Sequence, residues 1–472
     1  MSPPPRTEGY LSSDECSLPT GEDALLEAAR ARSVSRCSGM RPRLAPVEVA
    51  VRKQRSSLFT KIALHRRRAL FIGLLAVWGP GLAVMLADTD AGSLITAAQS
   101  GARWGYEMVL PQLVLIPALY AVQEITVRLG LCTGKGHGEL IRLHFGRGWA
   151  LLSVGALFLS ATGALVTEFA GLAGVGEMIG LPKDLTVCVA TVFLVSVAMT
   201  GSYRRLERVA VVFGLAELAL LPAMIFAHPN MSAVARSFGH VPLGNGSYLY
   251  LLAANVGAVI MPWMIFYQQG AVIEKRLGPK ALRAERHDTA VGAVVTQLIM
   301  IMMVIALAAA HGGGRGVALG TVGQVAAALK PYVGALASRI TIGLAVLGAA
   351  LVAALVASLA GAWGLSEVFG WRHTLNECPS RRSAKFYGAY VFAHLLGAGL
   401  VVASINLVGL TIDVEVMNAL LLPVVLGFLL LLECKALPAG RRMRGAHRVA
   451  VTAMCVVIMG FGVYMLPALA IR

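Results

Sequence analysis

Long apolar runs separated by short polar connections fill most of the chain after its first 66 residues. Each run contains a stretch of about 18–25 mostly apolar residues, the length that a helix needs to cross roughly 30 Å of hydrocarbon. The pattern predicts an all-α polytopic membrane protein with about eleven transmembrane helices. The expected spans are residues 69–98, 108–127, 149–179, 184–201, 208–227, 247–272, 290–311, 338–367, 385–404, 411–433 and 449–470.

The first part of the chain has a different character. Residues 1–66 are rich in Ser, Pro, Arg and Glu and contain no long apolar run. Such a segment cannot bury enough apolar surface to fold, so we expect a disordered, basic cytoplasmic N-terminal tail. It also lacks the apolar core of a signal peptide. The remaining residues, 67–472, are expected to form one transmembrane domain.

The distribution of charged residues predicts the orientation of the spans in the membrane. Charged residues make up only 14% of the chain, against about 25% in soluble domains, and the formal net charge is +16. Alternate connections hold most of the Lys and Arg, which places them inside and predicts a cytoplasmic N-terminus and an outside C-terminus. These basic connections are residues 128–147, 204–208, 275–286, 372–385 and 435–448. Nucleic acid is therefore not expected as a partner, and the lipid bilayer is.

Several kinds of chemistry are not indicated. The seven cysteines are scattered without CxxC spacing, so neither a disulfide framework nor a zinc site is expected. The sequence contains no HExxH, GxSxG or Walker motif. An enzyme is not predicted. The high Ala, Gly and Arg content and the absence of targeting motifs favour a bacterial inner membrane, that is, a plasma membrane.

The first span carries charge at its middle. It reads GPGLAVMLADTDAGSLITAAQSG, with Asp88 and Asp90 followed by Gly92 and Ser93. A carboxylate at the bilayer centre costs about 2.5–3.5 kcal/mol on insertion scales. Glycine and a short polar side chain beside it indicate that the helix is interrupted there, which is tolerated at this depth only where the backbone lines a cavity.

The sixth span carries a second candidate interruption. It reads AANVGAVIMPWMIFYQQGAV, with Pro262 shortly after Gly257 and Ala258. Kinks at proline often reflect only packing. Interruptions five spans apart, however, indicate the LeuT-like architecture with a 5+5 inverted repeat. Repeat one would be about residues 69–227, repeat two about 247–433, and the helix at about 449–470 would be an addition.

At DTDAGS and VIMPW the sequence resembles the NRAMP family of divalent metal transporters. The Asp-Pro-Gly-Asn motif of the family aligns with Asp90-Ala91-Gly92-Ser93, and its Met-Pro-His motif aligns with Met261-Pro262-Trp263. The segment QEITVRLGLCTGKGHGELIRLHFG also looks like the second helix of the family and its following loop. The resemblance spans most of residues 70–435.

The departures from the family motifs carry information of their own. Ser93 replaces Asn, Trp263 replaces His, and Thr167-Glu168 falls on a Thr-Asp pair whose second acid, three residues on, is Gly171. This pattern looks most like the NRAMP-related magnesium transporter branch. That resemblance implies a wide site that accepts partly hydrated Mg²⁺ or Mn²⁺. It also implies weak or absent proton coupling.

The expected metal-binding residues are Asp90, Ser93, Ala258 and Met261. A carboxylate and a freed backbone carbonyl are hard oxygen ligands, and Ser93 is short enough to leave room for a water that Mg²⁺ retains. Met261 is a soft ligand. If it touches the ion, Mn²⁺ or Fe²⁺ is favoured; if a hydration shell intervenes, it is only part of the wall.

Further polar residues could form an outer shell around the ion. They are Asp88, Glu168, Gln268, Glu415 and Asn418. Each has a plainer alternative: Glu415, like Asp413, could lie at the outer membrane interface, and Glu168 or Gln268 could serve only to bond helices together.

The sequence thus predicts a secondary transporter or uniporter for divalent metal ions, Mg²⁺ and/or Mn²⁺, which would bind at the membrane midplane. The protein is expected to be a monomer. No cofactor is expected beyond the transported ion. A proton-coupled Mn²⁺/Fe²⁺ importer is the first alternative. An organic-cation or amino-acid transporter of the same fold is the second, and Asp90 would disfavour an anionic substrate.

Overall fold

The structure is a computed structural model that describes residues 84–470 apart from 215, 218–219, 221–229, 312–315, 317, 373–378 and 405. Within these residues the chain is helical and forms no strand. The predicted tail of residues 1–66 and the first part of the predicted first span lie outside the described residues.

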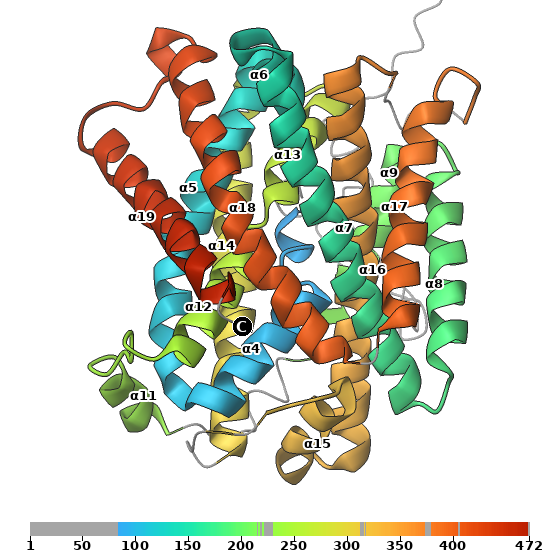
Figure 1. Cartoon of the computed structure of the whole chain (residues 1–472), viewed down its shortest axis with the longest axis vertical. Coiled ribbons are helices and arrows are strands. Elements are labelled where there is room, and N and C mark those ends of the chain that lie inside the picture. The colour runs from blue at the N-terminus through green and yellow to red at the C-terminus, as the bar shows by residue number, and fades with distance from the viewer. Residues whose placement is uncertain are drawn as a thin grey trace, which may run out of the picture. The chain divides into compact units, whose positions relative to one another are not determined.

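The helices follow one another along the chain with short connections (Figure 1). They are α4 (Ala91–Trp104), η1 (Gly105–Met108), α5 (Val109–Thr133), α6 (His137–Phe145), α7 (Arg147–Met178), α8 (Lys183–Ala198), α9 (Tyr203–Gly214), α11 (Met231–Ser237), α12 (Gly246–Val259), α13 (Pro262–Glu274), η3 (Pro279–Ala281), α14 (Leu282–Ala310), α15 (Val322–Val333), α16 (Ala335–Phe369), α17 (Ala384–Ala403), α18 (Leu407–Lys435), η4 (Ala439–Arg441) and α19 (Gly445–Ala470).

Eight helical stretches in the described part of the chain are long and apolar enough to cross a membrane. They are Ala91–Thr133, Arg147–Met178, Gly246–Glu274, Pro279–Ala310, Ala335–Phe369, Ala384–Ala403, Leu407–Lys435 and Gly445–Leu466. The prediction of an all-α polytopic membrane protein is confirmed. The total of eleven spans stays a prediction, because parts of the expected first and fifth spans fall on residues that are not described.

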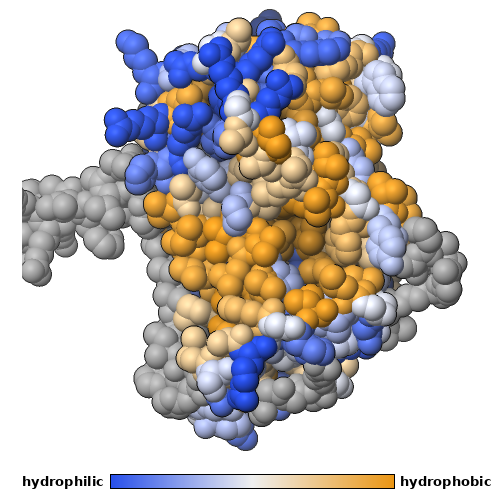
Figure 2. Space-filling view, turned by 90° about the vertical axis from the view of Figure 1, so that its left-hand side faces the viewer, coloured by the Kyte–Doolittle hydropathy of each residue, from blue (hydrophilic) through white to orange (hydrophobic). Residues whose placement is uncertain are grey.

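The surface is apolar where a soluble protein would be polar. Val189 and Val192 of α8 are each more than 60% exposed, and Val457 of α19 is 70% exposed. On the face that Figure 2 shows, hydrophobic side chains form a broad band across the middle, with hydrophilic side chains gathered mainly at one end. Several acidic side chains, in contrast, are buried in the interior, as described below. This inversion is what a lipid solvent favours, because hydrocarbon rewards apolar contact and penalises exposed charge.

The basic connections meet at one end of the helices. The Arg128 guanidinium, near the end of α5, donates to the carbonyl of Arg441 at 2.9 Å, and Arg142 of α6 donates to the carbonyl of Val368 at 3.0 Å. In Figure 1 this end carries α6 and the turn between α18 and α19, whereas α11 and α15 lie at the other end. We call the first of these the basic end.

Two helices are interrupted inside the bundle. The backbone turns at Ala87 and Asp88 and re-enters a helix only after Asp90, which is the N-cap of α4. Further along, α12 ends at Val259 and α13 begins at Pro262. Proline suits the first helical position, where its missing N–H would have no partner within the helix. Each interruption frees backbone groups that need other partners.

Candidate metal site

Asp90 is the centre of the first interruption. Its Oδ1 accepts a hydrogen bond from the backbone N–H of Ser93 at 2.6 Å, which caps the N-terminus of α4. Its other oxygen, Oδ2, is buried and has no hydrogen-bond partner among the described residues. A buried carboxylate oxygen without a donor is costly, so Oδ2 is the oxygen of Asp90 that would gain most from a nearby cation.

Ser93 connects the two interruptions. Its hydroxyl donates to the carbonyl oxygen of Ala258 at 3.0 Å, while its N–H holds Asp90. Ala258 lies in the last turn of α12, whose carbonyls have lost their helical partners and carry the negative end of the helix dipole. The structure therefore brings together Asp90, Ser93 and Ala258, three of the four expected metal-binding residues.

Glu168 of α7 stabilises the same helix start. Its Oε2 accepts the N–H of Ala91, the first residue of α4, at 3.1 Å, and its Oε1 accepts the hydroxyl of Thr167 at 3.0 Å. Together with Asp90, a second carboxylate thus occupies the N-terminal end of α4, where negative charge is favourable. Glu168 positions the first interruption and lies within electrostatic reach of Asp90.

Glu415 and Asn418 form a hydrogen-bonded pair on α18. Asn418 donates to Glu415 Oε2 at 3.1 Å and accepts the hydroxyl of Ser160 at 2.7 Å, whereas Glu415 Oε1 is buried without a partner among the described residues. The backbone of Gly92 lies directly against that oxygen. Asp413, two residues earlier, is exposed and bonds to Tyr250. Of the two acids, only Glu415 belongs to the interior.

Two further carboxyl groups, those of Asp88 and Glu217, lie within electrostatic reach of Asp90. Asp88 lies near Thr296 of α14, and the hydroxyl of Thr89 donates to Glu217. Both acids are buried. Glu217 was not among the expected site residues, although the same signal was present: a single ionisable residue inside a predicted apolar span.

Five buried carboxyl groups therefore surround the two interruptions. They belong to Asp88, Asp90, Glu168, Glu217 and Glu415. None of the five forms an ion pair in the described part of the chain, where the observed ion pairs lie outside this cluster. A concentration of buried acid without a basic partner strongly favours the entry of cations.

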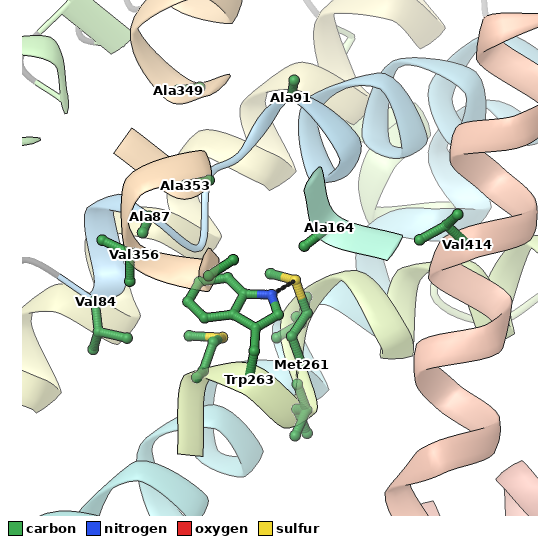
Figure 3. Close-up of a cluster of buried hydrophobic side chains, with 14 of the residues drawn as sticks. Val84, Ala87, Ala91, Ala164, Met261, Trp263, Ala349, Ala353, Val356 and Val414 are labelled. Atoms are coloured by element: carbon green, nitrogen blue, oxygen red, sulfur yellow. Dashed lines mark hydrogen bonds between the residues drawn. The ribbon is translucent and has the colours of Figure 1, made fainter. Parts of the chain in front are cut away.

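The second interruption is apolar. Met261 is fully buried, and its sulfur accepts a hydrogen bond from Nε1 of Trp263 at 3.1 Å. Figure 3 shows the indole ring packed among small and branched side chains, including Ala87 and Ala353, with its N–H directed at the sulfur. Met261 thus lies at the interruption as expected, but one lone pair of its sulfur is already engaged.

Gly171 and Gln268, two other positions that the sequence analysis singled out, are engaged in packing and bonding between helices. A side chain at Gly171 would collide with the Cβ of Ala91, so the close packing of α7 on α4 leaves no room there for the acid of the family pattern. Gln268 of α13 donates to the hydroxyl of Thr289 on α14 at 3.0 Å. No hydrogen bond joins it to the other expected site residues in the described part of the chain, which matches the plainer, helix-bonding alternative.

The donor set is sparse for a metal centre. Within the described residues, no three or more His, Cys, Asp and Glu side chains are grouped closely enough to hold a metal ion. An ion at Asp90 Oδ2 would have to complete its coordination with the Ala258 carbonyl, the Ser93 hydroxyl and water. Such an arrangement suits a weakly and transiently held ion better than a structural metal.

Residues 81–468 match the family described as natural resistance-associated macrophage protein-like, Nramp. The chain belongs to the Nramp family. The Nramp match includes both interruptions and extends through α18 to most of α19. Similar relatives are called divalent metal cation transporter MntH. That of *Brucella suis* biovar 1 is 26% identical over 65% of this chain and 70% of its own length, and that of *Klebsiella pneumoniae* subsp. *pneumoniae* is 29% identical over 61% and 71%.

Solved structures support the fold. The manganese transporter of *Eremococcus coleocola* matches with a TM-score of 0.68 at 16% identity, over 85% of this chain and 88% of that one. MhsT, solved with L-phenylalanine, matches with a TM-score of 0.57 at 13% identity, over 81% and 98%. These likenesses confirm the LeuT-like fold class of the Nramp chain.

Proposed function

We propose that this Nramp protein transports divalent metal cations across the membrane and binds each ion between its two helix interruptions. The observation that carries the proposal is the buried Oδ2 of Asp90, which accepts no hydrogen bond within the described residues and lies on a carboxylate bonded to Ser93, the residue that also holds the Ala258 carbonyl. The relatives named divalent metal cation transporter support the same substrate class. Transport, rather than catalysis, also agrees with the absence of known enzyme motifs in the sequence.

Mg²⁺ or Mn²⁺ is the substrate that the donor atoms favour. The available groups near Asp90 are oxygens, whereas Met261, the soft ligand among the expected metal-binding residues, has its sulfur engaged by Trp263. Few protein ligands and a short Ser93 leave space for waters, which Mg²⁺ releases reluctantly. These features support the magnesium-transporting branch of the family and a partly hydrated ion.

Weak or absent proton coupling is the second element of the proposal. Trp263 provides no titratable group beside the ion, and Gly171 has no room for an acid. The alternative, a proton-coupled Mn²⁺/Fe²⁺ importer, is favoured by one observation: the five buried carboxyls could accept protons. Measuring proton movement alongside metal uptake separates the two.

We also propose that the protein lies in a bacterial plasma membrane with its basic end in the cytoplasm. The arginines and lysines of that end satisfy the positive-inside rule. With this orientation the N-terminus is cytoplasmic and the C-terminus is outside. A monomer as the working unit is a separate part of the proposal.

The test uses purified protein in liposomes that contain a Mg²⁺-sensitive dye, with Mn²⁺ quenching of a second dye measured in parallel. Wild type should admit both ions, and Asp90→Asn should admit neither. Asp413→Asn is the matched control, because it makes the same chemical change on the exposed acid of α18. It should keep wild-type uptake.

A pH dye inside the same vesicles reports coupling. Uptake of Mg²⁺ without internal acidification supports a uniporter. Uptake of Mn²⁺ with stoichiometric acidification and no Mg²⁺ flux would establish the proton-coupled importer instead. Unchanged uptake in Asp90→Asn would contradict the assigned site in either case.

A further inference from the structure

A large cavity opens at the basic end, away from the candidate metal site. Its volume is about 850 Å³, and it lies between α5, α14 and the η4 turn. Nothing in the proposed transport mechanism uses it. Its lining combines two kinds of side chain, basic ones at the rim and aliphatic ones below.

The rim carries a concentrated positive charge. Lys280, Arg283, Arg286, His287 and Arg441 all line the cavity. Arg286 is held in place by Glu124 of α5, with Nε and Nη2 at 2.7 and 2.6 Å from Oε1. The side chains of Lys280 and Arg283 are exposed and form no ion pair within the described residues. An anionic group at the rim would therefore meet several unengaged donors.

The wall of the cavity is an apolar stripe along α14. Val291 and Val294 line it and are 50% and 43% exposed, and Leu298, 46% exposed, continues the same helix face. Starting from His287, these residues follow the spacing of one helix face. At 1.5 Å per residue the stripe runs about 16 Å from the rim, half of the roughly 30 Å hydrocarbon core. That is the depth of one leaflet.

We propose that this cavity binds a phospholipid with an anionic headgroup, its phosphate at the basic rim and an acyl chain along Val291, Val294 and Leu298. A soluble phosphate compound would match the rim but would leave the apolar stripe unused. A neutral phospholipid would match the stripe but not the charge. Basic pockets between membrane helices on the cytoplasmic side commonly select anionic lipids in this way.

A lipid bound in this cavity would also affect how the helices at the basic end are held together. Glu124, which holds Arg286, also pairs with Arg128 of α5 at 2.5 Å, and Arg128 lies 3.8 Å from Glu433 of α18. A phosphate at the rim would balance the positive charge around this network and hold α5, α14 and α18 together at the basic end. Bound lipid should therefore raise the thermal stability of the protein.

The test measures lipid retention by native mass spectrometry after delipidation. The probes are dioleoyl phosphatidylglycerol and dioleoyl phosphatidylcholine, which share acyl chains and differ in charge. The test variant is Lys280→Gln/Arg283→Gln. The control is Arg381→Gln/Arg382→Gln, which removes the same charge from exposed positions between α16 and α17, outside the cavity lining. Wild type and control should retain phosphatidylglycerol, and the test variant should bind it at least about tenfold more weakly.

A second variant tests the apolar part. Val294→Gln should weaken phosphatidylglycerol binding without changing the charge of the rim. Soluble glycerol phosphate should fail to displace the lipid. Equal retention of phosphatidylcholine, equal loss in both double variants, or displacement by millimolar glycerol phosphate would overturn the proposal. None of these readouts depends on metal transport, so the lipid site and the proposed function can fail separately.

Discussion

The two helix interruptions have opposite chemistry. The first is built around charge: Asp90 caps α4, and Glu168 accepts the N–H of Ala91. The second is built around apolar contact: Pro262 begins α13, and Met261 is tied to Trp263 through sulfur and indole. Only its last carbonyls, such as that of Ala258, offer oxygen to the site.

This difference in chemistry suggests different roles for the two interruptions in the proposed site. In the proposed site the charged interruption would supply the attraction for a cation, since a buried carboxylate without a basic partner gains most from one. The apolar interruption supplies shape, a neutral carbonyl and a wall. Selectivity between hard and soft metals then depends on whether the sulfur of Met261 stays engaged. The changes at Asp90, Met261 and Trp263 described below test this division, and the others test the packing around it.

The largest effect should come from comparing Asp90→Asn with Met261→Ala. Removing the carboxylate charge should lower metal uptake by about 100-fold, corresponding to roughly 3 kcal/mol for a lost charged ligand. Met261→Ala should keep Mg²⁺ uptake within a few-fold of wild type. Initial rates in the liposome assay measure both. Equal losses would mean that the sulfur is a ligand as important as the carboxylate.

A second comparison uses the glycines that bring both interruptions against Glu415. A methyl group at Gly257 would collide with the backbone carbonyl of Glu415, whereas at Gly92 it would meet the end of the Glu415 side chain, which can move. Gly257→Ala should therefore lower stability by about 1–3 kcal/mol, as overpacking does, and Gly92→Ala by less. Thermal unfolding in detergent measures the difference.

The control for this pair is Gly427→Ala on α18, the helix that carries Glu415. No atom lies within 4 Å of a methyl group at that position. Alanine there should be neutral or stabilise the helix by about 0.5–1 kcal/mol. If Gly92→Ala lowered stability more than Gly257→Ala, the Glu415 side chain would be held more rigidly than this packing argument assumes, and the argument would be contradicted.

A smaller effect is expected on selectivity. Trp263→Phe keeps an aromatic ring but removes the N–H that engages the sulfur of Met261. The freed sulfur should raise the ratio of Mn²⁺ to Mg²⁺ uptake by about fivefold, the equivalent of one hydrogen bond of roughly 1 kcal/mol. Trp149→Phe, at an exposed tryptophan of α7, should leave the ratio unchanged. An unchanged ratio in Trp263→Phe would show that the sulfur never reaches the ion.

A separate effect, on the pH dependence of stability, concerns the anchoring of α13 at the basic end. His137 is buried there with Nδ1 3.1 Å from Oε1 of Gln269, and burial lowers the pKa of His137 to about 4. The unfolded chain binds this proton near pH 6.5 and the folded chain does not, so stability falls as the pH drops from 6.5 towards 4. His137→Gln should remove this dependence, about 2 kcal/mol at pH 5. Denaturation at pH 7 and pH 5 measures it; identical pH profiles would contradict the burial argument.

Much of the site could be predicted because membrane interiors penalise charge and proline so strongly. Asp90, Glu168 and Glu415 are conspicuous in apolar spans, and Pro262 marks the second interruption. The same rule would have found Glu217, whose contact with Thr89 joins distant parts of the chain.

Other features depend on three-dimensional packing that a single sequence does not contain. Asp413 and Glu415 are two residues apart and look alike in sequence, yet one is exposed and the other buried, because two positions on a helix face different directions. The bond between Trp263 and Met261 depends on a side-chain orientation. The steric exclusion at Gly171 depends on how closely α7 approaches α4.

The central claim, that the ion binds between the two interruptions, is tested most directly by locating the ion. Crystals soaked in Mn²⁺ should give one strong anomalous peak beside Oδ2 of Asp90 and the carbonyl of Ala258, and Asp90→Asn crystals should lack it. Mg²⁺ in excess should remove the peak from wild type. A Mn²⁺ peak elsewhere in the bundle, unaffected by Asp90→Asn, would contradict the assigned site.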